Sequence, residues 1–317
     1  MSNVKRFPDR DCEPPSRSIS PRSANSSDGA GTTLCGSNTR CSTSGSGGPA
    51  AISGEWNLDH PPEPPASLAQ SVLAPDYTSK AIDISARVSQ AAEQSTVLAL
   101  LREGTRSLGA EHAVFISFVR ESSQVSACRF MLSCDLDWCR RYLEAGLVAH
   151  DPWLSYAAQH SEPIVASSLV ATKPAQQHAI DLARSSGFAS AVILPAHSGA
   201  GHSRISALVL GSSTSGFFES EGFELFRVAS RVLALELHDW WLARTRRELI
   251  ARARITPIEL ELLRLQYQGH SSKRMSIELR VSKCSIDSHF QRMNIKLGVA
   301  NRKMAVHLAL ESGIRLG

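Results

Sequence analysis

The sequence has no long apolar run. None of its 317 residues belongs to a stretch that approaches the ~20 consecutive apolar residues needed for a membrane-spanning helix. The N-terminal segment also lacks the apolar run that follows the basic residues of a secretory signal peptide. These two absences argue against a membrane protein and an exported protein, and we expect no membrane partner.

Cysteines are few and scattered, and no pair has the Cys-x-x-Cys spacing. Their number is odd, and their spacing fits neither a disulfide framework nor a zinc site. We therefore predict no metal ion and a reducing, cytoplasmic environment. The cysteines are Cys12, Cys35, Cys41, Cys128, Cys134, Cys139 and Cys284.

The sequence also lacks the residue patterns of common enzyme sites. No Ser-His-Asp order, pair of carboxylates or phosphate-binding loop stands at predicted strand ends. We therefore predict no catalytic residue, no cofactor and no enzymatic activity. The enzyme alternative would have the middle of the chain hydrolyse or conjugate a small molecule, and it predicts turnover of a bound ligand by the purified protein.

The N-terminal segment is poor in aromatic side chains. Of the first 50 residues, 26 are Ser, Thr, Gly or Pro, and Phe7 is the only aromatic. A cluster of prolines follows at residues 61–65. Such a composition cannot bury enough apolar surface to offset the conformational entropy of the chain. We expect a disordered extension over residues 1–76.

The last 63 residues, 255–317, carry the start and stop signals of four short helices. The sequence Thr-Pro-Ile-Glu at 256–259 provides an N-cap, a proline at the first helical position and a carboxylate three residues after the cap. The residues that would cap the other three helices are Ser271, Ser282 and Asn301. This pattern predicts an all-α domain with a helix-turn-helix at its centre.

The third of these helices is the candidate for contact with DNA. In a helix-turn-helix the second helix of the motif enters the major groove, with its N-terminal residues nearest the bases. Its predicted inward face is Ile286, Phe290, Met293 and Leu297. The polar face suits phosphates and base edges, and the predicted DNA contacts are Lys283, Cys284, Asp287, Ser288, Gln291 and Arg292. The alternative is a small helical bundle with a solvated polar face.

Positive charge is concentrated in this C-terminal region. Residues 244–317 carry 15 Lys and Arg against 6 Asp and Glu, a balance of +9, while the whole chain carries +4. Neutralisation of DNA phosphates requires such a concentration. The arginine-rich segment 244–254 is interpreted as a basic linker, which either contacts phosphates or keeps the linker solvated.

Residues 255–310 resemble the DNA-binding domain of LuxR-type transcription regulators. The resemblance implies the helix-turn-helix fold and double-stranded DNA as a partner. It departs from the family pattern at Ile258, Ser276, Arg280 and Cys284-Ser285, where the family usually has Arg, Ala, Gly and Arg-Thr. The matching residues are Thr256, Pro257, Glu259, Glu261, Gly269, Ser272, Leu279, Ser282, Ile286, His289, Lys296, Leu297, Gly298, Val299, Asn301, Arg302, Ala305 and Val306.

Residues 77–243 alternate between helical and strand patterns. Strands that follow one another through short hairpins favour an antiparallel sheet, and the interspersed helices can cover both of its faces. We predict an α-β-α sandwich, so that the whole chain is α+β. The predicted strands are 113–120, 125–132, 164–167, 191–196 and 205–211, and the predicted helices are 79–108, 135–145, 152–159, 174–186 and a long helix from 219 to the linker.

One constellation in this segment points to a small ligand. Trp138 and Tyr142 are four residues apart, so they share a helix face, and Asp151 follows in the next loop. A buried indole, phenol and carboxylate in an apolar pocket can hold the polar head of an amphipathic molecule. From spacing alone, however, the simpler interpretation is an aromatic pair in the core and an aspartate that caps the helix starting at Pro152.

The same spacing, Trp138-x3-Tyr142-x8-Asp151-Pro152, resembles the acyl-homoserine-lactone-binding domain of LuxR-type quorum-sensing receptors. The resemblance implies that Trp138 donates to the lactone carbonyl, that Asp151 accepts from the amide N–H and that Tyr142 lines the acyl chain. Ala166 stands where the family has a second pocket tryptophan, and Cys134 where it has a tyrosine. These departures imply a wider pocket or a lost hydrogen bond to the acyl carbonyl.

Both resemblances, in this order over residues 95–317, imply a ligand-responsive quorum-sensing regulator. Its expected partners are an acyl-homoserine lactone or a related amphipathic signal and a two-fold symmetric operator. Two-fold operators favour a homodimer, and RNA polymerase is a further candidate partner. The alternative is an orphan regulator whose middle domain, 77–243, binds a non-lactone signal or only a protein.

Overall fold

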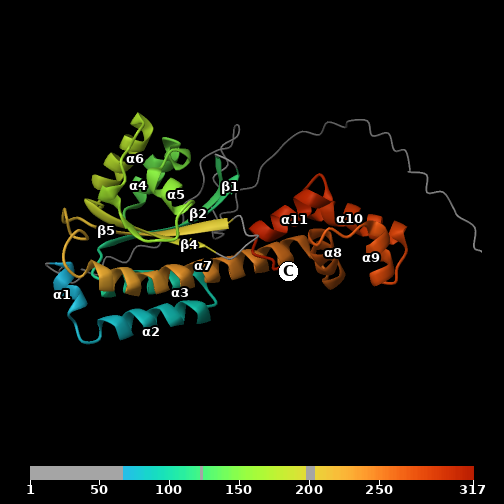
Figure 1. Ribbon diagram of the computed structural model, residues 1–317, viewed down its shortest axis with the longest axis horizontal. Coiled ribbons are helices and arrows are strands. Elements are labelled where there is room, and N and C mark those ends of the chain that lie inside the picture. Colours follow the sequence, from blue (N-terminus) through green and yellow to red (C-terminus); the bar gives the residue numbers. More distant parts are fainter. Residues whose placement is uncertain (1–66, 122–123, 198–203) are drawn as a thin grey trace, which may run out of the picture. The chain divides into compact units, whose positions relative to one another are not determined.

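The computed structural model of the chain describes residues 67–121, 124–197 and 204–317 (Figure 1). The prediction of disorder for residues 1–66 lies outside the described residues. Within the described ranges, no helix combines the length and the apolar character needed to cross a membrane.

The start of the described chain corrects the predicted extent of the disordered segment. Helix α1 spans Leu68–Val72, and the Ser67 side chain accepts a hydrogen bond from the Gln70 backbone N–H at its N-terminus. Leu68 is fully buried in the same core as residues of the long helix near residue 230. The prediction was wrong for residues 67–76 because composition averaged over a long segment hides the contribution of one well-packed leucine.

A five-stranded antiparallel sheet forms the centre of the middle domain, as the hairpin pattern predicted. The strand order is β2-β1-β5-β4-β3, so the two N-terminal strands lie at one edge and the short β3 at the other. The strands are β1 His112–Glu121, β2 Gln124–Ser133, β3 Ile164–Val165, β4 Ser190–His197 and β5 Arg204–Ser212.

Both faces of this sheet are apolar, because successive side chains of a strand point to opposite faces. In β1, Phe115 packs into one core, whereas Val114 and Ile116 pack into the other. In β5, Leu208 and Leu210 likewise alternate with Ala207 and Val209. A sheet with two apolar faces needs a layer of helices on each face.

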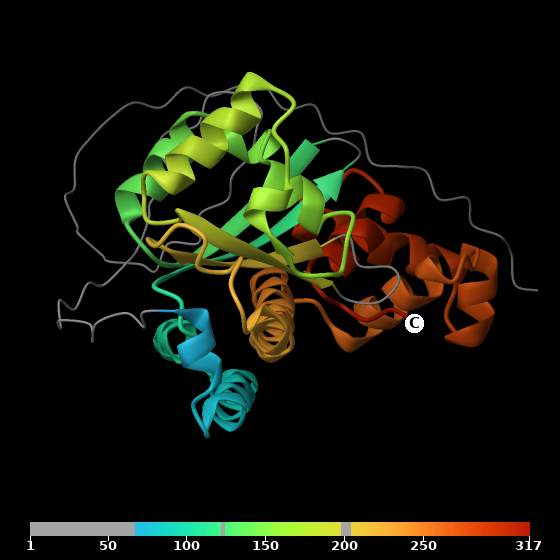
Figure 2. The same ribbon diagram turned by 60° about the vertical axis from the view of Figure 1, so that its left-hand side comes forward.

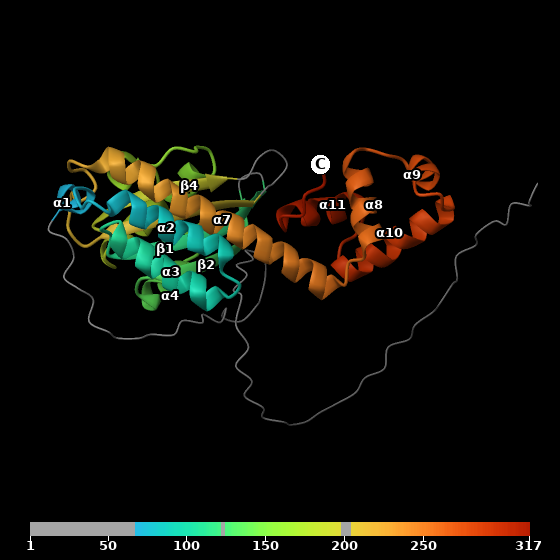
Figure 3. The same cartoon turned by 90° about the horizontal axis from the view of Figure 1, so that it is seen from below.

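Helices supply those two layers, which confirms the α-β-α sandwich (Figures 1 and 2). The first layer contains α2 Tyr77–Gln90, α3 Gln94–Ser107 and α7 Phe223–Ala253, which lie side by side in Figure 3. The second layer contains α4 Leu136–Glu144, α5 Pro152–Ala157 and α6 Pro174–Arg184, with the single turns η1 Leu147–Ala149 and η2 Ala166–Ser168. Trp138, which belongs to α4, therefore lies in the second layer.

Helix α7 differs from its prediction at both ends. It begins at Phe223 rather than at residue 219, and it continues without a break to Ala253. Arg254 ends it in the left-handed region, at φ +46°. The basic segment 244–253, interpreted as a linker, is thus helical, because no Gly or Pro interrupts it.

The C-terminal domain has the four predicted helices, α8 Pro257–Tyr267, α9 Ser272–Glu278, α10 Lys283–Leu297 and α11 Arg302–Glu311. Every predicted N-cap is present, since the side chains of Thr256, Ser271, Ser282 and Asn301 each accept a backbone hydrogen bond. Gly298 closes α10 in the left-handed region, at φ +68°. The predicted inward face of α10 is buried, with Ile286, Phe290, Met293 and Leu297 in one core.

Candidate functional site

A buried cavity lies between the sheet and the second helical layer. The space within it that a water molecule can reach is about 20 Å³. Residues of β1, β2, β5, α4 and α5 line it, together with Asp151 and Phe188: Val114, Ile116, Phe130, Trp138, Tyr142, Asp151, Trp153, Leu154, Phe188 and Val209. The lining is apolar except for two indoles, one phenol and one carboxylate. This composition suits the polar head of an otherwise apolar ligand.

Helix α4 brings two of the predicted residues into the cavity. Asp135 caps the helix by accepting a hydrogen bond from the Asp137 backbone N–H. One turn apart, Trp138 and Tyr142 are both buried and stack with ring centroids 5.2 Å apart and an interplanar angle of 29°. The predicted shared face is therefore present, and it faces the sheet.

Asp151 joins this pair and also caps α5. Its Oδ2 accepts a hydrogen bond from the Tyr142 hydroxyl at 2.5 Å. Its Oδ1 accepts from the backbone N–H of Trp153 at 2.7 Å and of Leu154 at 3.4 Å. The two interpretations of this aspartate are thus compatible, since one carboxylate oxygen serves the cap and the other lies at the phenol.

Burial controls the ionisation of both groups. Burial raises the pKa of Asp151, against the opposing effect of the hydrogen bonds from Tyr142, Trp153 and Leu154. Burial and the neighbouring Asp151 carboxylate raise the pKa of the Tyr142 hydroxyl well above its usual value. Tyr142 therefore remains a hydrogen-bond donor to the carboxylate at physiological pH.

The sequence predicted three of the ten lining residues, and Trp153 and Phe188 are among the seven that it missed. Trp153 is 7% exposed, and its ring lies 6.5 Å from that of Phe188. Phe188 also lies 5.8 Å from Trp138. A Cβ at Gly211 would fall 2.2 Å from the Phe188 ring, so the glycine lets this ring lie against β5. The adjacency of Trp153 to Asp151-Pro152 was a signal for the first residue, whereas nothing local indicated Phe188.

Ala166 lies outside this set of lining residues. It begins the turn η2, is partly buried and packs against the same core. The other departure, Cys134, is buried in that core. The inference that Ala166 widens the pocket stays a prediction. The cavity that is present is lined by the large side chains of Trp153 and Phe188.

The predicted DNA-contacting face of α10 divides into two groups. Lys283, Cys284, Gln291 and Arg292 are exposed, as a surface that meets DNA requires. Asp287 and Ser288 are partly buried. Four of the six predicted contact residues are therefore accessible to a partner, and their contact with DNA stays a prediction.

The Asp287 side chain is hydrogen-bonded within the domain. Its Oδ1 accepts hydrogen bonds from Arg302 of α11 at 2.5 Å and from the Ser272 hydroxyl of α9 at 2.9 Å. The Arg302 guanidinium also lies 4.1 Å from the centre of the Phe290 ring. Partial burial opposes ionisation of Asp287, but the hydrogen bonds from Arg302 and Ser272 lower its pKa. Asp287 therefore ties three helices together.

A second ion pair holds the other end of α10. Lys296 Nζ lies 2.8 Å from Glu259 Oε1, and the Glu259 side chain is only 3% exposed. The same carboxylate accepts from the Thr256 backbone N–H as part of the capping box of α8. Breaking such a pair leaves a buried charge without compensation. The orientation of α10 is thus set at both of its ends.

Comparison with known families assigns both regions. The autoinducer binding domain matches residues 93–239, and the family of bacterial regulatory proteins, luxR family, matches residues 253–309. The chain belongs to the LuxR-type quorum-sensing transcription regulators. In this LuxR-type regulator the cavity lies in the autoinducer-binding domain and α10 in the DNA-binding domain, and the family is one of transcription regulators.

Individual relatives agree with this assignment. The chain is 26% identical over 181 residues to the HTH-type quorum sensing-dependent transcriptional regulator RpaR of Rhodopseudomonas palustris. The matched segment covers 56% of this chain and 71% of the relative. It is similar in fold to SdiA of Escherichia coli, with a TM-score of 0.59 and 16% identity over 75% of this chain and 99% of that one. A structure of SdiA with octanoyl-rac-glycerol gives a TM-score of 0.57 and 16% identity, over 75% and 96% of the two chains.

One departure from the LuxR pattern strains the turn of the helix-turn-helix. Arg280, where the family usually has Gly, adopts φ +55°. The turn ends α9 with a hydrogen bond from the Val281 N–H to the Ser276 carbonyl, as in a helix terminus with a left-handed residue after the cap. A side chain with a Cβ is disfavoured in this conformation.

We expect Arg280→Gly to stabilise the DNA-binding domain by about 1 kcal/mol, which should raise its melting temperature by roughly 4–8 °C. Thermal unfolding followed by circular dichroism measures this. Arg280→Ala removes the same charge but keeps the Cβ, so it should not stabilise. An equal rise for both variants would attribute the effect to charge rather than to the backbone.

Proposed function

We propose that this LuxR-type regulator binds an acyl-homoserine lactone in the buried cavity and controls transcription from a two-fold symmetric DNA site. The main supporting observation is that Trp138, Tyr142 and Asp151, spaced as in the receptors of this class, line one mostly apolar cavity. By that resemblance, Trp138 donates to the lactone carbonyl, Asp151 accepts from the amide N–H, and Tyr142 lines the acyl chain.

The geometry around Asp151 supports this assignment. Oδ2 has a second lone pair beyond the one that accepts from Tyr142, so it can also accept from a ligand N–H. The Trp138 indole N–H is buried and, within the described part of the chain, has no hydrogen-bond acceptor. A ligand carbonyl at this nitrogen would supply the missing acceptor, because unsatisfied buried donors are costly.

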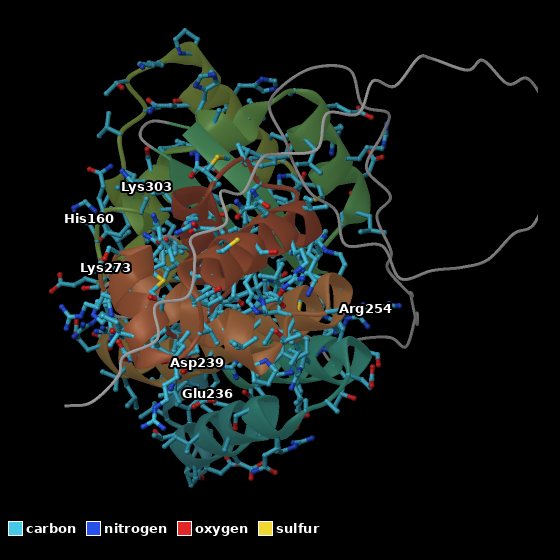
Figure 4. The ribbon with its side chains drawn as sticks, turned by 90° about the vertical axis from the view of Figure 1, so that its right-hand side faces the viewer. His160, Glu236, Asp239, Arg254, Lys273 and Lys303 are labelled. Atoms are coloured by element: carbon cyan, nitrogen blue, oxygen red, sulfur yellow. The ribbon has the colours of Figure 1, made fainter. Side chains whose placement is uncertain are left out.

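The DNA-binding face supports a matching role for α10. Lys283 and Arg292 are exposed cations, and Gln291 is an exposed amide suited to base edges. Lys273 of α9 and Lys303 of α11 are further exposed cations of the same domain, and Figure 4 labels both. We assign the base and phosphate contacts to these exposed residues, with Cys284 and Ser288 beside them and Asp287 in a positioning role.

Mass spectrometry of the small molecules retained by the protein tests the proposed ligand. The protein is expressed with and without a mixture of acyl-homoserine lactones and then purified. Retention of one lactone by the wild type supports the proposal. Retention of a molecule without the acyl amide would favour the non-lactone alternative, and no retained molecule with unchanged operator affinity would favour a protein partner.

An exposed apolar stripe on α7 supports a homodimer. Leu225, Val228 and Leu235 are 42%, 57% and 45% exposed, and the partly buried Val232 lies between them. The spacings of three, four and three residues place all four side chains along one face of the helix. A stripe of this kind is the seam along which two helices pack.

Charge along the stripe complements a second, antiparallel copy. Arg231 precedes Leu235 by four residues, and Asp239 follows it by four. Figure 4 shows Asp239 beside Glu236 on α7. Burial and the neighbouring Asp239 raise the pKa of Glu236. In an antiparallel pair about Leu235, each Arg231 would meet the Asp239 of its partner.

We therefore expect Leu235→Glu to shift the protein from dimer to monomer, because a two-fold contact would place two carboxylates opposite each other. Sedimentation equilibrium over a range of concentrations measures this. Val170→Glu serves as the control, since Val170 is also highly exposed, at 82%, but lies before α6. An undisturbed dimer for Leu235→Glu would place the contact elsewhere.

A further inference from the structure

The residues that line the cavity have more polar groups than the proposed contacts of Trp138 and Asp151 use. Trp138 and Trp153 each have a buried indole N–H for which the described residues provide no acceptor. Both residues line the cavity and are more than nine-tenths buried, at 5% and 7% exposed. Two residues that line the cavity therefore each have an unpartnered donor, and a third has a carboxylate.

The order of these groups around the cavity follows from their contacts. Trp138 stacks on Tyr142, whose hydroxyl donates to Asp151. Asp151 in turn accepts from the backbone N–H of Trp153, at the start of α5. The carboxylate thus lies between the two indoles in this chain of contacts, and Phe188 contacts both indole rings. The two indole side chains and the carboxylate thus belong to one continuous set of contacts beside the cavity.

We propose that Trp153 is a second recognition donor, which selects ligands with a carbonyl oxygen on each side of an N–H group. The inference rests on the proposed function, and it assigns the acyl carbonyl of the ligand to the Trp153 N–H while Trp138 takes the ring carbonyl. If the cysteine at position 134 removes a hydrogen bond to the acyl carbonyl, a donor from Trp153 would replace it. It also makes Trp153 the residue that determines preference for amide-linked acyl chains.

The test compares two ligands that differ by one carbonyl. N-octanoyl-homoserine lactone carries both the ring and the acyl carbonyl, whereas N-octanoyl-cyclopentylamine carries the acyl carbonyl alone. Affinities are measured by isothermal titration calorimetry with full-length wild type, Trp138→Phe and Trp153→Phe. Each phenylalanine keeps an aromatic ring in the cavity and removes the N–H.

One lost neutral hydrogen bond should weaken binding by about 2- to 12-fold. Trp138→Phe should show this loss with the lactone and not with the cyclopentylamine derivative. Trp153→Phe should show it with both ligands. Trp241→Phe is the matched control, because the Trp241 N–H is also buried without an acceptor in the described structure but lies in the opposite core; it should leave both affinities unchanged.

Stability separates a recognition role from a packing role. The melting temperature of Trp153→Phe without ligand measures the packing lost with part of the buried ring, whereas a recognition role also predicts a smaller rise in melting temperature on adding the lactone. Unchanged affinities for Trp153→Phe would overturn the inference and leave the proposed function intact. A cost seen only with the lactone would move Trp153 to the ring carbonyl, and wild type that binds neither ligand would overturn both proposals.

Discussion

Phe290→Ala should unfold the DNA-binding domain and abolish binding to every DNA sequence. Phe290 is 1% exposed, belongs to the core of α8–α11 and carries the Arg302 guanidinium on its ring face. Truncation of a buried phenylalanine costs about 3–5 kcal/mol. A domain of this size has a stability of roughly 3–9 kcal/mol. Hydrogen exchange in the full-length protein should therefore show loss of protection in α8–α11.

Arg292→Ala should fail in a different way. Arg292 is exposed, and its guanidinium lies near His289 at 3.3 Å on the same helix. Its loss should leave hydrogen exchange and thermal unfolding unchanged and should weaken operator binding. If Arg292 contacts a guanine edge, the variant should lose ~1–3 kcal/mol of binding free energy at cognate sites only. If it contacts a phosphate, binding to all sequences should weaken, and the slope of the logarithm of the binding constant against the logarithm of the salt concentration should fall by about one.

The two variants together test which face of α10 contacts DNA. A folded protein that lacks the side chains of Lys283, Gln291 and Arg292 but keeps wild-type operator affinity would contradict the proposed face. The DNA contacts would then have to come from the arginines at the C-terminal end of α7. The Asp287 network adds a control, since Asp287→Asn should disturb the packing of α10 before it changes specificity.

The fold of the DNA-binding domain could be predicted because its signals are local. Each helix start is set by a side chain that hydrogen-bonds within three residues of itself, such as Thr256 with Glu259, and each apolar stripe has one period. The sheet could be predicted for the same reason, since short hairpins and alternation require only neighbouring residues. The antiparallel order and the two helical layers then follow from burial of both apolar faces.

The site could be predicted only where its residues are close in sequence. Trp138 and Tyr142 share a helix face, so spacing alone brings them together. Phe188 precedes β4 and reaches the cavity through a close approach to Gly211 of β5. No local pattern indicates this contact. Asp287 has the polarity and the helix position expected of a DNA contact, but its side chain pairs with Arg302 of another helix. Through-space contacts of this kind require the coordinates.

Asp151→Asn should weaken the response to the signal far more than it weakens the fold. The asparagine keeps Oδ1, which accepts from the Trp153 and Leu154 backbone N–H groups, so the cap of α5 is preserved. An NH2 group replaces Oδ2, and it would face the ligand N–H as donor against donor. Loss of a hydrogen bond to a charged group costs roughly 1.5–3 kcal/mol, or about 10- to 150-fold in affinity.

Stability should change less than the response in this variant. Burial raises the pKa of Asp151 and so disfavours its charged form in the folded protein, which offsets the loss of the acceptor for the Tyr142 hydroxyl. A carboxyl whose pKa is raised by folding destabilises the protein as the pH rises above its unfolded pKa, and a neutral asparagine removes that cost. Asp151→Ala is the contrasting variant: it loses the cap and every hydrogen bond to the Tyr142 hydroxyl, whose oxygen can still accept from the asparagine NH2 of Asp151→Asn. Asp151→Ala should therefore destabilise the sensor domain as well. Dose-response curves in a reporter strain, read beside thermal melts, measure both effects. A wild-type dose-response curve for Asp151→Asn would remove Asp151 from the ligand contacts and leave it as the cap of α5.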